Sequence, residues 1–215
     1  MAGPKPLLPK YSRFPLALVL IINFLAYSAT RLVTHGFVHY NLSLPLDSQI
    51  PFIPAFSLIY VLAFVQWVVG FILIARDSRE LCYKVLSGEI IAKLICMVIY
   101  IIVPTTMTRP EITGSGFLSD FVQFIYKVDT PDNLLPSLHC FESWLCFRGA
   151  MWMKSTGKGY KYFSFVFTLL VFASTVLVKQ HVVIDIVAGV LVCELGQFIA
   201  EKTNSARFFE YIAKE

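Results

Sequence analysis

A histidine and an aspartate stand four residues apart in the last apolar stretch of the 215-residue chain, at His181 and Asp185. On a helix this spacing puts both side chains on one face, so the carboxylate can accept a hydrogen bond from the imidazole Nδ1–H. Such a bond fixes the tautomer and leaves Nε2 free to act as a nucleophile. Because an isolated pair of this kind is more often structural, a catalytic role requires further polar groups at the same place.

A second group of polar residues begins another apolar stretch, in the segment Pro136-Ser137-Leu138-His139. Pro136 suits the first turn of a helix, where free backbone N–H groups and the Ser137 hydroxyl favour an anion. Arg109 lies in the preceding polar segment, and a guanidinium can bind two phosphate oxygens at once. These residue types predict phosphate chemistry, provided that the helices bring them together with His181.

The composition indicates that these helices lie in a membrane. Hydrophobic residues make up 57% of the chain and charged residues 15%, whereas soluble domains carry about 25% charged residues. A soluble enzyme and a nucleic-acid partner are therefore excluded, and the continuous apolar runs lack the alternation of a membrane barrel. We predict an all-α, single integral membrane domain over residues 1–215. Its six spanning helices are expected at Phe14–Ala29, Pro51–Ala75, Val85–Pro104, Pro136–Met153, Tyr162–Val178 and Val182–Glu201.

The placement of the basic residues predicts the orientation. Twelve of the 18 Lys and Arg residues lie in the two terminal segments and in the connections 76–84 and 154–161, and four lie on the opposite side. By the positive-inside rule, both termini then face the cytoplasm. The same count puts His139 and His181 together at the non-cytoplasmic face, which is a separate argument for one site.

The long connection after the third predicted span contains an amphipathic segment, 117–128. We expect a helix lying in the membrane interface, which either borders a lateral entry for a lipid or covers the end of the bundle. Its apolar face consists of Leu118, Phe121, Val122, Ile125 and Val128.

Several charged residues fall inside the predicted spans, where each needs a partner or a route to water. Glu89 and Lys93 have the order and spacing of a helical ion pair. Arg148 is close enough to the cytoplasmic boundary to extend to it. Glu194 has no evident partner in the sequence.

Other candidate functional residues are expected to be structural. Glu142, three residues after His139, is predicted to make a buried hydrogen bond, with tuning of that histidine as the alternative. His35 and His39 have metal-like spacing but no further ligand nearby, and the five cysteines are expected to be packing residues. No metal and no cofactor is predicted.

With these residues, the chain resembles the type 2 phosphatidic acid phosphatase superfamily. That family has three motifs: Lys-x6-Arg-Pro, Pro-Ser-Gly-His, and Ser-Arg-x5-His-x3-Asp. The first motif is similar to the sequence ending at Arg109-Pro110, the second to 136–139, and the third to Ser174-Thr175-x5-His181-x3-Asp185. The likeness covers about Arg109 to Asp185, within a motif-bearing region of about residues 102–189.

The resemblance implies a membrane-embedded hydrolase of lipid phosphates, either phosphatidate-like or isoprenyl phosphates, that works without a metal. His181 would attack phosphorus to form a phosphohistidine, and Asp185 would orient it. His139 would protonate the leaving oxygen and then activate water or another acceptor. Arg109 and Ser137 would hold the phosphoryl oxygens.

Three positions depart from the family motifs. Ile102 and Thr175 stand where the motifs have lysine and arginine, and Leu138 stands in place of glycine. Lys179 is the first candidate to replace a missing cation, and Lys127 is the second.

The Pro-Ser-Leu-His variant also resembles the branch that contains inositol phosphorylceramide synthases. Members of that branch transfer a phospho-headgroup between lipids, and a phosphodiester donor carries less charge than a monoester. The sequence thus leaves open a phosphatase, a lipid phosphotransferase and a non-catalytic member of the same fold.

Overall fold

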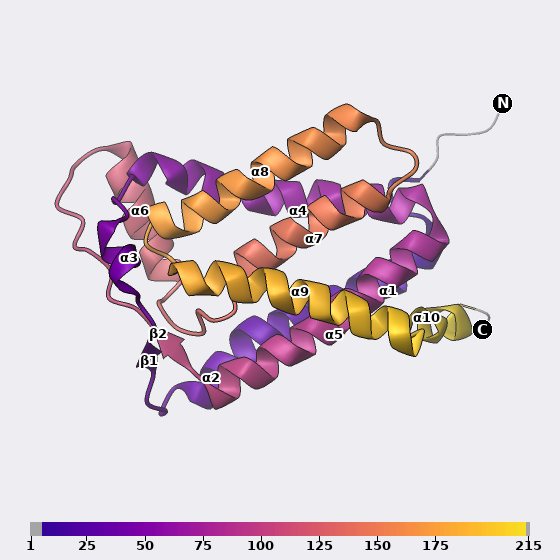
Figure 1. Cartoon of the computed structure of the whole chain (residues 1–215), viewed down its shortest axis with the longest axis horizontal. Helices are drawn as coiled ribbons and strands as arrows, with labels where there is room; N and C mark the ends of the chain where they lie inside the picture. The colour runs from indigo at the N-terminus through magenta and orange to yellow at the C-terminus, as the bar shows by residue number, and fades with distance from the viewer. Residues whose placement is uncertain (1–5, 214–215) are drawn as a thin grey trace.

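A computed structural model describes residues 6–213, and its long helices run along one axis in a bundle (Figure 1). Five helices are long and apolar enough to cross a membrane, and the chain is an all-α polytopic membrane protein. The first is continuous from Lys10 to Thr34 and comprises α1 (Lys10–Phe24), a π-helical segment (Leu25–Ala29) and α2 (Thr30–Thr34). The others are α4 (Ser57–Asp77, after a 3₁₀ turn at Pro54–Phe56), α5 (Arg79–Ile102), α8 (Lys158–Leu177) and α9 (Val183–Thr203).

The predicted span that is missing from these five, Pro136–Met153, corresponds to α7 (Leu138–Trp152), which has 15 residues. A helix of this length extends for about 22 Å, less than the roughly 30 Å of a hydrocarbon core. It is nevertheless central in the bundle, packed against α4, α8 and α9 (Figure 1). The count of six spans therefore stays a prediction, although α7 is present at the predicted place.

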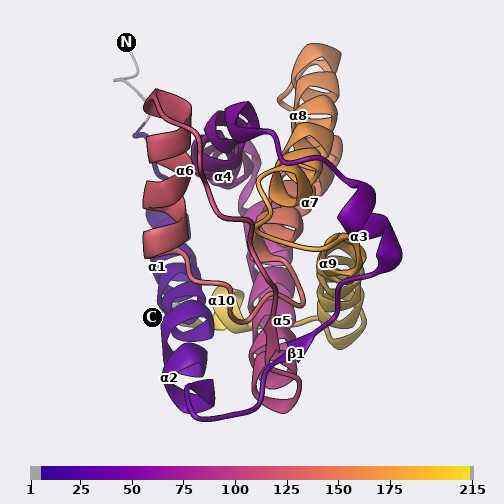
Figure 2. The same ribbon diagram turned by 90° about the vertical axis from the view of Figure 1, so that its left-hand side faces the viewer.

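The connecting elements gather at one end of the bundle, here called the loop end, formed by residues 35–56 and 103–137. They are α3 (Pro45–Gln49), α6 (Phe117–Val128) and two short strands, β1 (Tyr40–Asn41) and β2 (Thr105–Thr106), which pair in parallel. Figure 2 views the molecule from this end and shows α3 and α6 on opposite sides of it. The short α10 (Ala206–Ile212) lies at the other end (Figure 1).

The predicted amphipathic helix is confirmed as α6, with the expected bounds. Val122 and Ile125 are buried, whereas Val128, assigned to the same face, is 56% exposed. The inward face is therefore narrower than the sequence indicated, because only the middle of the helix packs on the bundle.

Two pairings of charged residues were not evident from the sequence. The predicted ion pair between Lys93 and Glu89 is wrong. The Lys93 ammonium instead lies 2.5 Å from Glu142 Oε1 of α7 and 2.5 Å from Asn23 Oδ1 of α1. The four-residue spacing of Glu89 and Lys93 does not decide the pairing, because the Glu142 carboxylate on the neighbouring helix lies closer to the buried ammonium. Both Glu89 carboxylate oxygens are buried without a partner in the described part of the chain.

The second pairing supplies the partner that Glu194 lacked. Its Oε1 lies 2.8 Å from Arg148 Nε and accepts a hydrogen bond from Trp144 Nε1 at 2.7 Å. The α7–α9 interface thus contains an ion pair in its half remote from the loop end. The five cysteines are buried and free, in agreement with the packing role predicted for them.

A close approach of α9 to the start of α7 positions the candidate site. A Cβ on Gly189 would lie 2.7 Å from the Ser137 carbonyl oxygen, so only glycine fits there. The Ser137 backbone N–H also donates to the Asp185 carbonyl oxygen at 3.1 Å. Both contacts tie the beginnings of α7 and α9 together at the loop end.

Candidate active site

The predicted hydrogen bond between His181 and Asp185 is present, with 3.1 Å between Nδ1 and Oδ2. The two residues do not share a helical face, however, because α9 begins at Val183 and His181 lies in the preceding turn. Asp185 is in the first turn of α9 and its Oδ2 also accepts from the Val182 backbone N–H at 3.0 Å. In the tautomer that donates from Nδ1–H to this carboxylate, Nε2 is free to act as a nucleophile.

His139, in the first turn of α7, faces His181 across a cavity, with 6.5 Å between the ring centroids. The Tyr60 ring stacks on His139 at a centroid distance of 3.9 Å, and the Phe64 and Trp67 rings contact it edge-on. His139 is buried and its Nε2 has no partner in the described part of the chain. These contacts hold the imidazole in place and leave Nε2 available to a bound molecule.

The cavity has a volume of about 510 Å³ and is lined by both histidines, Tyr60, Gln180 and Asp129. Its remaining wall is largely apolar and comes from α1, α4 and α6, through side chains that are exposed on the outside of the bundle. These are Leu20, Phe24, Val61, Phe64, Phe124 and Val128. A hydrocarbon chain can therefore contact the cavity wall from the side of the bundle.

Arg109 lies behind the cavity instead of lining it. Its Nη1 donates to the Asp129 carbonyl oxygen at 2.7 Å, and its guanidinium stacks over the Tyr126 ring. Its Nη2 donates to Gln180 Oε1. In this arrangement Arg109 acts on the cavity through Gln180.

Gln180 was not singled out in the sequence, where its only signal was its position next to His181. Its side chain is buried and lines the cavity. Because Arg109 donates to Oε1, the other end of the amide must be Nε2, and Nε2 has no partner among the described residues. A buried unpaired N–H donor beside the candidate nucleophile is suited to a phosphoryl oxygen.

Two predicted phosphate ligands are placed elsewhere. The Ser137 hydroxyl is buried and accepts from the Cys140 backbone N–H at 3.3 Å, as the N-cap of α7. The Lys179 ammonium binds the carbonyl oxygens of Asp47 and Ile50 at 3.0 and 2.6 Å. The Lys179 backbone is left-handed, with φ 55°, and the turn brings its side chain to the α3 segment instead of the cavity.

Of the three motif positions that depart from the family, Leu138 lines the cavity, whereas Ile102 and Thr175 lie away from it. Ile102, at the end of α5, is 70% exposed on the outside of the bundle. The buried Thr175 hydroxyl donates to the Phe172 carbonyl oxygen at 2.8 Å. Lys127 is exposed on α6. As a result, no Lys or Arg side chain of the described residues lines the cavity.

Asp129 lines the cavity and was missed by the sequence analysis. Its carboxylate accepts hydrogen bonds from the Tyr60 hydroxyl at 2.7 Å and the Tyr27 hydroxyl at 3.0 Å. Burial raises the pKa of this carboxyl, but His139, His181 and the two hydroxyls outweigh burial and hold the pKa below its ordinary value. Asp129 is therefore ionised at neutral pH.

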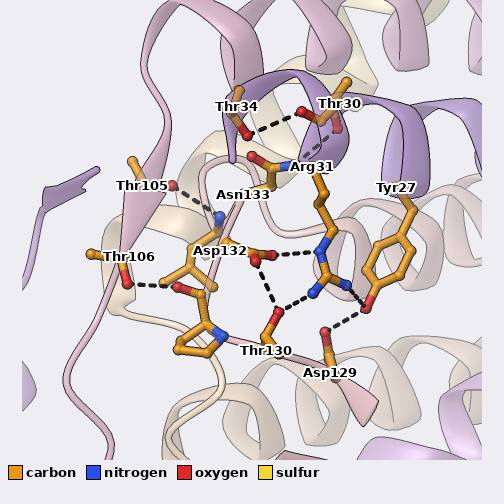
Figure 3. A network of polar contacts seen from close by, with 12 residues as sticks. Tyr27, Thr30, Arg31, Thr34, Thr105, Thr106, Asp129, Thr130, Asp132 and Asn133 are labelled. Atoms are coloured by element: carbon orange, nitrogen blue, oxygen red, sulfur yellow. Dashed lines mark hydrogen bonds and ion pairs between the residues drawn. The ribbon is translucent and has the colours of Figure 1, made fainter. Parts of the chain in front are cut away.

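A polar network fixes the loop that carries Asp129 (Figure 3). Arg31 Nε pairs with Asp132 at 2.8 Å, Nη1 donates to the Tyr27 hydroxyl at 2.8 Å, and Nη2 donates to the Thr130 hydroxyl. Asn133 Nδ2 donates to the Thr30 hydroxyl at 2.9 Å. The first helix thus holds residues 129–133 in place. Because the Arg31 guanidinium is engaged in these contacts, it is not free to bind a phosphate.

The fold and the site define a class: all-helical membrane proteins with a histidine–aspartate pair facing a second histidine across a buried cavity. A family model of the PAP2 superfamily matches residues 31–199, more than half of the chain, and the chain belongs to this superfamily. A comparison with curated protein sequences found no match. Membership supports lipid phosphate chemistry of the phosphatase or phosphotransferase type.

Proposed function

We propose that this protein cleaves the phosphate ester of a membrane lipid, with His181 as the nucleophile, and passes the phosphoryl group to water or to a lipid alcohol. The observation that carries this proposal is the orientation of His181 by Asp185, with His139 facing it at 6.5 Å. The nucleophile and a second proton-transfer group then line one cavity, and the group that orients the nucleophile lies directly behind it.

In the first half-reaction, His181 Nε2 forms a bond to phosphorus while the bond from phosphorus to the leaving oxygen breaks. Protonated His139 donates its proton to that oxygen. In the second half, His139 takes a proton from the acceptor, the acceptor oxygen bonds to phosphorus, and the P–N bond breaks. The Gln180 amide N–H donates to a phosphoryl oxygen throughout, and Arg109 keeps it oriented.

The absence of Lys and Arg from the described cavity lining favours a phosphodiester donor over a monoester. A monoester dianion needs more compensating positive charge than a diester, which carries one negative charge. This observation supports the headgroup-transfer alternative that the Pro-Ser-Leu-His sequence suggests, as well as diester hydrolysis. The non-cytoplasmic location of the site rests on the distribution of basic residues.

The test is to trap the covalent intermediate. Purified protein in nanodiscs is mixed with phosphatidic acid or a phosphodiester lipid, quenched during turnover and mapped by mass spectrometry. We expect a phosphoryl or headgroup-phosphoryl adduct on His181, accumulation in His139→Ala, and none in His181→Ala. His35→Ala changes an exposed histidine outside the cavity and is the matched control. Full turnover by well-folded His181→Ala would contradict the proposal.

A further inference from the structure

The cavity contains a carboxylate, Asp129, that neither forms nor breaks a bond in the proposed reaction. Asp129 is ionised, yet no Lys or Arg among the described residues forms an ion pair with it. The Tyr27 and Tyr60 hydroxyls hydrogen-bond to it without neutralising its charge. A carboxylate beside a phosphate site repels the substrate unless a positive charge binds together with the phosphate.

The other cavity carboxylates have cationic partners from the protein. Arg31 pairs with Asp132 at 2.8 Å and Lys93 pairs with Glu142 at 2.5 Å. Glu142 Oε2 nevertheless has no partner in the described part of the chain, and this side chain, 4% exposed, lines the cavity. A second acidic oxygen without a hydrogen-bond partner is thus buried in the same cavity, although Lys93 pairs with the other oxygen of its carboxylate.

Aromatic rings contribute much of the cavity wall, and two of them, Tyr27 and Tyr60, contact Asp129. Tyr27, Tyr60, Phe64 and Trp67 line the cavity together with Asp129. Aromatic faces bind alkylammonium groups, and such binding is strongest where water is excluded. A hard metal ion would instead need several free oxygen ligands, whereas both Asp129 oxygens already accept hydrogen bonds.

The carboxylate lies a short distance from the candidate nucleophile site. Tyr60 connects the two: its ring stacks on His139 at 3.9 Å, and its hydroxyl donates to Asp129 at 2.7 Å. A phosphate at His181 and a positive charge at Asp129 can therefore belong to one small headgroup.

We propose that the cavity binds the headgroup of a zwitterionic phospholipid, with Asp129 and the surrounding aromatic rings holding its ammonium group while the phosphate lies between His139 and His181. This inference rests on the proposed function for the position of the phosphate. It assigns the substrate class: phosphodiester lipids with an alkylammonium headgroup, such as phosphocholine or phosphoethanolamine.

The kinetic experiment compares four lipids with identical acyl chains in nanodiscs: phosphatidylcholine, phosphatidylethanolamine, phosphatidylglycerol and phosphatidic acid. We expect kcat/KM for the two ammonium lipids to exceed that for phosphatidylglycerol by about tenfold or more. Asp129→Asn should remove this preference by lowering only the ammonium-lipid rates, and Asp129→Glu should retain it. Asp120→Asn, the same change at an exposed position of α6, should have no effect.

A binding experiment separates this inference from the proposed reaction. His181→Ala, which is expected not to turn over, is titrated with short-chain phosphatidylcholine or phosphatidylglycerol, with and without Asp129→Asn. Binding is followed by intrinsic tryptophan fluorescence, to which Trp67 of the cavity wall contributes. Tighter binding of phosphatidylcholine that depends on Asp129 supports the headgroup site even if no lipid is consumed. Equal binding and equal rates for all headgroups would overturn the headgroup site and leave the phosphohistidine reaction intact. If Asp129→Asn does not fold, the wild-type headgroup panel and Asp129→Glu decide the question.

Discussion

At the scale of single residues, the site depends on a few directional hydrogen bonds. Asp185 fixes the proton on His181 Nδ1, and Arg109 fixes the orientation of the Gln180 amide. Each of these residues acts through the neighbour that it orients, so a substitution that preserves shape but changes hydrogen bonding is the informative test.

Asp185→Asn is expected to keep the fold but to lower kcat by about 10³–10⁴-fold, because an amide can stabilise the wrong tautomer of His181. KM should change little, since Asp185 does not line the cavity. Steady-state kinetics on the preferred lipid measure both constants. Asp120→Asn is the surface control, and a mutant with normal kcat would show that the pair is structural.

Gln180→Leu is expected to lower kcat by about 10²-fold, the usual loss when one donor to a developing negative charge is removed. The substitution leaves the volume similar and deletes the unpaired Nε2. Gln49→Leu, at an exposed position of α3, is the control. A loss confined to KM would mean that Gln180 binds the ground state and the transition state equally.

At the scale of elements, the site depends on the contact between α7 and α9. These helices carry His139 and Asp185, and they approach closely because Gly189 has no side chain. The hydrogen bond from the Ser137 backbone N–H to the Asp185 carbonyl oxygen holds the beginnings of the two helices together.

Gly189→Ala is expected to destabilise the protein by about 1–3 kcal/mol, because the new methyl group would lie 2.7 Å from a backbone carbonyl that cannot move freely. Activity should fall as well, since the two helix beginnings must separate. Thermal unfolding in detergent and lipid turnover are the two measurements. Gly159→Ala, where nothing lies within 4 Å of the added atom, should leave both unchanged.

At the scale of the whole molecule, the loop end and the opposite end differ in charge. Residues 76–84 and 154–161 carry six basic side chains, in or near the adjoining ends of α4 and α5 and of α7 and α8, and these ends lie far from the loop end (Figure 1). By the positive-inside rule, this asymmetry predicts that the loop end, with the candidate site, faces the non-cytoplasmic side.

The orientation can be tested with single cysteines on a background whose native cysteines are buried. Gly36→Cys and Gly157→Cys are matched, since both positions are exposed and no atom lies within 4 Å of an added Cβ. On intact cells a membrane-impermeant thiol reagent should label the first and not the second. The reverse pattern would move the site to the cytoplasmic face.

The sequence by itself determined the features that depend on local spacing and composition. The apolar runs specified an all-α membrane protein, the amphipathic period specified α6, and the motif residues identified both histidines and Asp185 as neighbours. These features are local because helical hydrogen bonds and hydrophobic burial act along one segment at a time.

Only the tertiary structure decided which polar groups meet across helices. Lys93 pairs with Glu142 instead of Glu89, Lys179 extends to the α3 segment, and Arg109 reaches the cavity only through Gln180. Asp129, far in sequence from Tyr27 and Tyr60, enters the cavity because a loop folds over the bundle. Such contacts follow from the packing of several helices and from the need of each buried charge for a partner, neither of which is encoded in the spacing of any one segment.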